Sequence, residues 1–73
     1  MPHIEIKLFP GYGEEKKREL TQSILEAVSK DLDVPRRVIS VAFEEIPKDQ
    51  WQEKVYEPLI AGRKGLAAAP DYQ

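Results

Sequence analysis

The order of three segments at the start of the chain most constrains its fold. Residues His3 to Phe9 alternate, with Ile4, Ile6 and Leu8 on one face, which is the period of a half-buried strand. A proline and two glycines within residues 10–13 predict a turn after this strand. The strand is therefore expected to end there and to be followed by a loop.

Strong helix formers begin at Glu14 and continue to about Leu32, with acidic residues in the first turn. Apolar residues recur at steps of three and four, at Leu20, Ile24, Leu25, Ala27, Val28 and Leu32. This pattern predicts one amphipathic helix. The helix should stop at Asp33-Val34-Pro35, because proline disfavours the helical conformation of the residue before it.

A second strand is expected over Val38 to Glu45, which is rich in β-branched and aromatic residues. Two strands joined by a helix pair in parallel through a right-handed crossover. The predicted fold class is therefore α/β: a β-α-β unit with parallel strands and a C-terminal arm. We expect a single domain over residues 1–73, with a core over 2–46 and the arm over 47–73.

The arm has a short helical pattern from Trp51 to Leu59, interrupted by Pro58, and its apolar side chains need a surface to cover. A two-stranded sheet with one helix also leaves an open edge and an uncovered face. A chain of 73 residues buries only about 60 % of its unfolded surface, and it has no cysteine for a disulfide. We therefore expect two copies to join into a four-stranded sheet.

Composition excludes several classes of function. The absence of cysteine excludes a thiolate metal site or a cysteine nucleophile, and His3 alone cannot build an imidazole metal site. The net charge of -2, with interleaved signs, argues against nucleic acid as a partner. No apolar stretch approaches the roughly 20 residues that span a bilayer. We expect a cytoplasmic protein with no cofactor, no nucleic-acid partner and no membrane association.

Pro2 is the first candidate for chemistry. Methionine is normally excised ahead of a small residue such as proline, which would leave a secondary amine at the head of the first strand. A free α-amino group has a pKa of about 7.7 to 8.0, and an apolar pocket or a nearby cation would lower that pKa. Such an amine is matched to general-base catalysis near neutral pH. If Met1 stays, the nitrogen is an amide and is not basic.

Motifs across nearly the whole chain resemble the 4-oxalocrotonate tautomerase family: the N-terminal run from Met1 to Gly11, then Glu14 to Leu20, Val34-Pro35 before the second strand, and residues 47–51. The tail, with Trp51-Gln52 and Ala69-Pro70-Asp71-Tyr72, is more similar to the subgroup of bacterial phenylenolpyruvate tautomerases. The resemblance implies that Pro2 moves a proton between carbon and oxygen of a small enol or keto acid, without a metal or organic cofactor. It also implies oligomers. Hexamers occur in the family, and the longer tail favours a homodimer.

The resemblance also suggests substrate-binding positions. The two arginines of well-known family members correspond here to Tyr12 and Ser40, neither of which carries a positive charge. This departure puts the diacid substrate of the founding enzyme in doubt. The aromatic wall of the family pocket corresponds to Trp51, which packing alone would equally explain. Phe9 is a further candidate for the lining of a pocket shared between subunits, although packing in the core explains it as well.

Two alternatives remain open from the sequence. The same proline, in its protonated form, is suited to act as a general acid in hydration or dehalogenation of unsaturated acids. The missing arginines also fit a non-catalytic homo-oligomeric binding module. The remaining cations that could hold a carboxylate are Arg36, Arg37, Arg63 and Lys64, and the sequence does not rank them.

Overall fold

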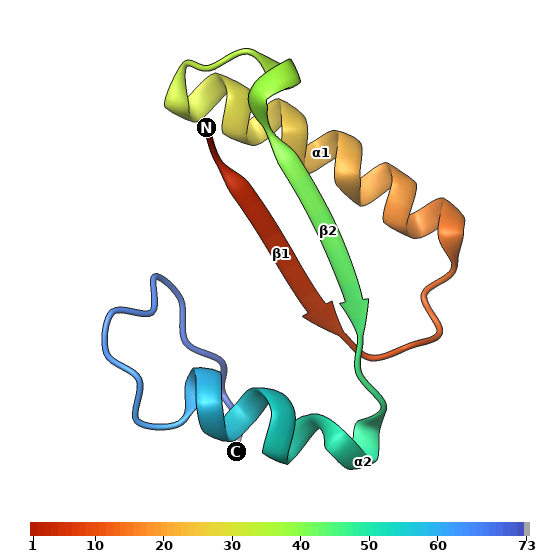
Figure 1. Ribbon diagram of the computed structural model, residues 1–73, viewed down its shortest axis with the longest axis vertical. Coiled ribbons are helices and arrows are strands. Elements are labelled where there is room, and N and C mark those ends of the chain that lie inside the picture. The colour runs from red at the N-terminus through yellow and green to blue at the C-terminus, as the bar shows by residue number, and fades with distance from the viewer. Residues whose placement is uncertain (73) are drawn as a thin grey trace.

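The computed structural model describes residues 1–72 of the chain. Two strands lie side by side, a long helix connects them, and a second helical segment crosses below their C-terminal ends (Figure 1). The elements are β1 (His3–Leu8), α1 (Glu14–Leu32), η1 (Arg36–Val38), β2 (Ser40–Glu45), α2 (Lys48–Trp51) and η2 (Gln52–Ile60). The strands are parallel, so the predicted β-α-β unit and its α/β class are confirmed.

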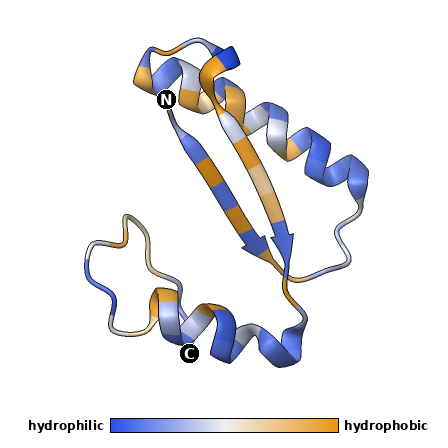
Figure 2. Cartoon of the chain, viewed as in Figure 1, coloured by the Kyte–Doolittle hydropathy of each residue, from blue (hydrophilic) through white to orange (hydrophobic). Residues whose placement is uncertain are grey.

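The register of the sheet separates an apolar face from a polar face. His3 pairs with Ser40 and Leu8 pairs with Glu45, and side chains of paired residues share a face. The apolar face therefore carries residues 4, 6 and 8 of β1 with 41 and 43 of β2, and the alternation along β1 is visible in Figure 2. Helix α1 lies on this face, since Leu20 and Leu8 line one hollow.

Helix α1 has the predicted bounds. It begins after Gly13, whose positive φ of 87° suits glycine, and its first turn carries two glutamates. It ends at Asp33 in the left-handed conformation, with φ of 57°, where the Ser29 hydroxyl donates a 2.6 Å hydrogen bond to the carbonyl of Val34. These local contacts end the helix just before Pro35.

Both strands are shorter than the sequence predicted. β1 ends at Leu8 rather than Phe9. The Leu8 carbonyl accepts a 2.8 Å hydrogen bond from the N–H of Ile46, the residue that follows β2, and this is the last bond between the two strands. β2 begins at Ser40 rather than Val38. Residues 36–38 instead form the 3₁₀ turn η1, with a hydrogen bond from the Val38 N–H to the Pro35 carbonyl.

The arm is more helical than expected. Helix α2 continues into η2, a wider π-helical segment that runs through Pro58 to Ile60. Proline lacks an N–H and its ring crowds the carbonyl four residues earlier in an α-helix. In the wider turn, the Ala61 N–H bonds to the Tyr56 carbonyl, five residues back, at 2.7 Å. The change of register therefore accommodates a proline that was expected to interrupt the helix.

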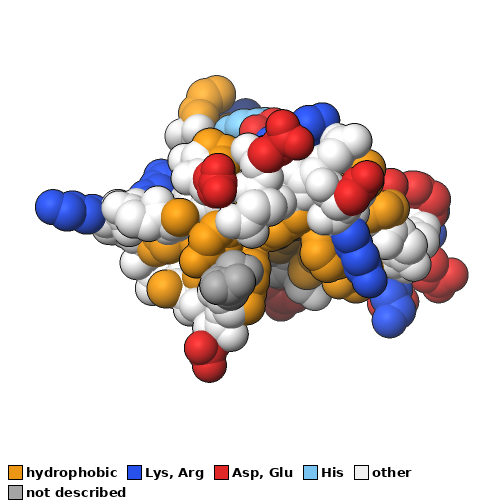
Figure 3. All heavy atoms as spheres, turned by 90° about the horizontal axis from the view of Figure 1, so that it is seen from below, with side chains coloured by type: hydrophobic (Ala, Val, Ile, Leu, Met, Phe, Trp, Pro, Cys, Tyr) orange, Lys and Arg blue, Asp and Glu red, His pale blue; other side chains and the backbone are white. Residues whose placement is uncertain are grey.

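The apolar surface is incompletely covered. Among residues 1–72, the buried apolar side chains are Ile46 and Val55, and α1 contains no buried residue. The radius of gyration is 13.9 Å, whereas a compact domain of this length would have about 11 Å. Figure 3 shows apolar side chains exposed across the middle of one face. The chain by itself is an open arrangement of elements.

Candidate active site

Pro2 lies at the head of β1 and is half-buried. Its carbonyl accepts a 3.2 Å hydrogen bond from the backbone N–H of Ser40, which ties the residue to the first position of β2. Met1, in contrast, is 95 % exposed. The residue that would carry the amine is therefore held by the sheet, while the residue that must be removed projects into solvent.

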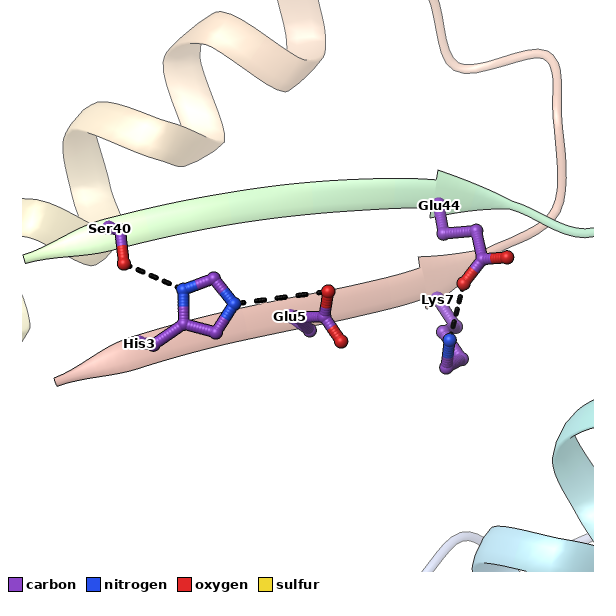
Figure 4. A network of polar contacts seen from close by, with 5 residues as sticks. All are labelled: His3, Glu5, Lys7, Ser40 and Glu44. Carbon is purple, nitrogen blue, oxygen red and sulfur yellow. Dashed lines mark hydrogen bonds and ion pairs between the residues drawn. The ribbon is translucent and has the colours of Figure 1, made fainter.

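The residues next to Pro2 along the sheet carry polar side chains. Ser40 Oγ and His3 Nδ1 are joined by a 2.6 Å hydrogen bond, and His3 Nε2 lies 3.8 Å from a carboxylate oxygen of Glu5. These side chains share the face of the sheet opposite α1 (Figure 4). Ser40 thus lies beside the N-terminal end of β1, whereas His3 points along an exposed polar row.

A group of aromatic rings lies at the other end of β1. Phe9 and Trp51 meet edge to face, with ring centroids 5.0 Å apart. The Trp51 indole N–H donates a 3.0 Å hydrogen bond to the hydroxyl of Tyr72, and the Tyr72 ring lies 5.7 Å from that of Tyr56. The end of the arm thereby returns to the start of its own helix.

These rings enclose part of a cavity of about 360 Å³, which we call the aromatic pocket. Its lining residues are Lys7, Leu8, Phe9, Tyr12, Trp51 and Tyr72. Tyr12 is 53 % exposed and also lines a larger hollow of about 550 Å³ beside α1, with Leu8 and Leu20. Because aromatic and aliphatic carbons dominate the aromatic pocket, it suits an apolar, planar group.

The chain divides the predicted site residues between two places. Pro2 and Ser40 lie at the start of β1, and Phe9, Tyr12 and Trp51 lie beyond its end. A strand rises roughly 3.3 Å per residue, so residues 2 and 9 are about 23 Å apart. One copy of the chain therefore does not bring the Pro2 nitrogen to the aromatic pocket.

Sequence reasoning missed two residues of the aromatic pocket. Tyr72 was noted only as part of a tail motif, because no periodicity indicates that residue 72 returns to Trp51. Lys7 was given no role, since it alternates with the apolar residues of the first strand and so falls on the opposite face. Lys7 lies at the end of the first strand, directly before Leu8 and Phe9. This position could have indicated that it borders the same pocket as Phe9.

The charged residues near the pocket are paired. The Lys7 ammonium donates a hydrogen bond to Glu44 on β2, and this bond raises the pKa of Lys7 and lowers the pKa of Glu44. Lys17 on α1 lies 3.1 Å from both Glu14 and Glu45, and its hydrogen bonds to these carboxylates raise its pKa. Lys7 is the cation that lines the aromatic pocket.

The four cations that the sequence left unranked lie elsewhere. None of Arg36, Arg37, Arg63 and Lys64 lines the aromatic pocket or the hollow beside α1. Arg36 instead donates a 3.3 Å hydrogen bond to Gln22. Over residues 1–72 no three histidine or acidic side chains gather in a way that could hold a metal ion. Within the same range, no helix combines the length and apolarity needed to cross a membrane.

Comparison with known proteins identifies the family. Residues 2–55 match the model of the tautomerase enzyme family. The chain is 36 % identical to Tautomerase PptA of Pectobacterium carotovorum, over 99 % of this chain and 97 % of that protein. It is 34 % identical to a probable tautomerase of Xylella fastidiosa, over 99 % of this chain and 89 % of that protein. The resemblance seen in the sequence is thus confirmed: the chain belongs to the tautomerase family and is an isomerase.

Proposed function

We propose that this enzyme catalyses cofactor-independent keto-enol tautomerisation of enolpyruvate-type substrates, with the amine of Pro2 as the general base once Met1 has been removed. The observation that carries the proposal is the attachment of Pro2 to the sheet through its carbonyl, beside an exposed Met1. A nitrogen fixed by its ring and by the strand is preorganised for proton transfer.

The reaction needs one proton to move between two atoms of the substrate. The unprotonated Pro2 amine takes the proton from the enol hydroxyl, and the resulting ammonium returns it to the carbon that becomes a CH₂ group next to the new carbonyl. The amine ends as it began, so no other reagent is consumed. Positioned general bases typically contribute about 10²-fold to 10⁴-fold to the rate.

The proposal includes a second copy of the chain, since Pro2 and the aromatic pocket lie at opposite ends of β1. Among residues 1–72, β1 pairs only with β2, so its outer edge is unpaired there. If two β1 edges paired antiparallel, the head of each strand would lie beside the far end of the other. The Pro2 of one copy would then face Phe9 and Trp51 of its partner.

The open packing of the single chain supports this assembly. Leu20 on α1 is 42 % exposed and Tyr12 is 53 % exposed, and both line the hollow between α1 and Leu8 of β1. A second copy would cover these apolar atoms and the unpaired strand edge together. We expect a cytoplasmic homodimer in which the whole chain, core and arm, acts as one unit. A hexamer of three such dimers would keep the same pairing.

The first experiment measures intact mass and then the rate of phenylenolpyruvate ketonisation on the same sample. We expect protein without Met1 to be active and Pro2→Ala to reduce kcat/KM by about 10²-fold or more. The rate should rise with pH through one ionisation below the value of a free α-amino group. Pro35→Ala, a change at an exposed proline before η1, is the matched control and should leave the rate unchanged.

Three results would contradict the proposal. One is processed protein that converts no enolpyruvate. Another is activity that is the same in Pro2→Ala as in the unaltered protein. A loss of activity in Pro35→Ala equal to that in Pro2→Ala would also contradict it, since the effect would then belong to folding rather than to the amine.

A further inference from the structure

The aromatic pocket combines an apolar body with one cation. Five of its six lining residues present apolar or aromatic surface, and the sixth is Lys7. An enolpyruvate carries a carboxylate next to the reacting atoms, and a carboxylate taken into an apolar pocket needs a charged partner. In this family member, neither Tyr12 nor Ser40 supplies such a charge.

We infer that Lys7 is the residue that binds the substrate carboxylate, while the rings of Phe9, Trp51 and Tyr72 hold the substrate's aryl group. The inference rests on the proposed function for the identity of the substrate. It adds a binding residue and selects aryl over short alkyl enolpyruvates, because the pocket wall is built of aromatic rings in mutual contact.

Glu44 prepares Lys7 for this task. The Lys7 side chain is 29 % exposed and its ammonium is held across the sheet by Glu44, as Figure 4 shows. The ammonium has three donors, and Glu44 uses one of them. Two donors therefore remain for a substrate carboxylate in the pocket that Lys7 lines, and the negative charge of Glu44 weakens that binding without blocking it.

The neighbouring lysines are less suited. Lys48 lies 5.4 Å from the centre of the Phe9 ring, but it lines a separate shallow hollow with Pro10 and Gly11. Lys17 is already bound by two carboxylates on the side of α1. Lys48 is therefore a control of equal charge, close to the same aromatic ring but outside the aromatic pocket.

The test measures binding rather than turnover, using quenching of Trp51, the single tryptophan of the chain. The two probes are 3-phenylpropionate and its uncharged analogue, 3-phenylpropionamide. Lys7→Met should weaken binding of the acid by about 10-fold to 100-fold, as expected for a charge-assisted hydrogen bond. Binding of the amide should change by less than about 2-fold. Lys7→Arg should retain most of the preference for the acid, and Lys48→Met should leave it intact.

Glu44→Gln gives an independent result of opposite sign. Removal of the competing carboxylate should strengthen binding of the acid and leave that of the amide unchanged. This variant keeps the inference testable even if Lys7→Met fails to fold, which far-ultraviolet circular dichroism would reveal.

The inference is overturned if Lys7→Met weakens acid and amide equally, if the loss follows Lys48→Met, or if neither probe binds the unaltered protein. These outcomes are separate from failure of the proposed function. Proline-dependent turnover with no role for Lys7 refutes the inference alone, whereas Lys7-dependent binding without proline-dependent turnover refutes the proposed function alone.

Discussion

The two ends of β1 differ in almost every physical property. At its head, Pro2 is bonded through its carbonyl to the backbone of Ser40, the Ser40 side chain bonds to His3, and Met1 next to Pro2 projects into solvent. Beyond its other end, Phe9 and Trp51 belong to a cluster of rings with a cavity between them. One end carries the proposed base, Pro2, without an enclosing pocket, and the other carries the aromatic pocket and Lys7 without a proposed base.

Under the proposed function, this difference means that the chain carries two halves of a site rather than one whole site. A proton-transfer enzyme needs both the base and a dry, shaped cavity in one place. With about 23 Å between the halves, the assembly proposed above is the simplest way to unite them. The predictions below alter one half at a time.

The largest effect is expected when the base alone is removed. A variant that keeps an additional residue before Pro2 has an amide in place of the amine, and its kcat/KM should fall by about 10²-fold to 10⁴-fold. Binding of 3-phenylpropionate should weaken far less than kcat/KM falls, because the residues that line the aromatic pocket are unaltered. Equal losses of binding and turnover would show that the two ends are not independent.

The next effect is expected when the aromatic wall alone is removed. Trp51→Ala deletes the ring that contacts Phe9 and bonds to Tyr72, and KM for phenylenolpyruvate should rise by about 10-fold to 100-fold. The apparent pKa of the base should also rise, since the wall excludes water from it. An unchanged pH-rate profile would argue against contact between this wall and the base.

A smaller effect is expected at the closing contact of the arm. Tyr72→Phe keeps the ring and removes the hydroxyl that accepts the indole N–H of Trp51. Loss of one such hydrogen bond should cost about 0.5 to 1.5 kcal/mol, which corresponds to about a 2-fold to 10-fold rise in KM. Tyr56→Phe is the matched control: the same hydroxyl is removed from the ring that lies against Tyr72. Equal effects of the two changes would assign the loss to general packing.

The smallest effect concerns the pair between Lys7 and Glu44. The pKa of Glu44 is lowered by the hydrogen bond from Lys7, so the pair stabilises the fold above the ordinary pKa of the carboxyl and loses this contribution as the pH falls through the lowered value. Glu44→Gln should slightly reduce the melting temperature at about pH 7 and by less at about pH 2.5. Glu26→Gln on the exposed side of α1 controls for loss of charge. A larger destabilisation at the lower pH would reverse the predicted sign.

Much of the fold was predictable because its signals are local. The alternation over β1, the spacing along α1 and the stop at Pro35 each depend on neighbouring residues. The predicted strand, helix and second strand are all present. The strand ends were wrong by one or two residues at Phe9 and Val38, where a long-range bond to Leu8 and a 3₁₀ turn decide the boundary.

The site was less predictable because its contacts are not local. Trp51 and Phe9 were singled out and do meet. The return of Tyr72 to Trp51 joins residues 21 positions apart, and no spacing rule encodes it. The continuation of the helical segment through Pro58 was also missed. Proline normally indicates the end of a helix, and the π-helical turn that accommodates it here is rare.

The most direct test of the central claim is a mixing experiment with two impaired variants, assayed at phenylenolpyruvate concentrations well below KM. One variant keeps an additional residue before Pro2 and so lacks the basic amine. The other, Trp51→Ala, lacks the wall, so neither homodimer has a complete site. In an equal mixture that exchanges subunits, half of the dimers are mixed and each mixed dimer has one complete site, which should restore about a quarter of the unaltered activity. Mixture activity no higher than the average of the two variants would contradict a site shared between two copies of the chain.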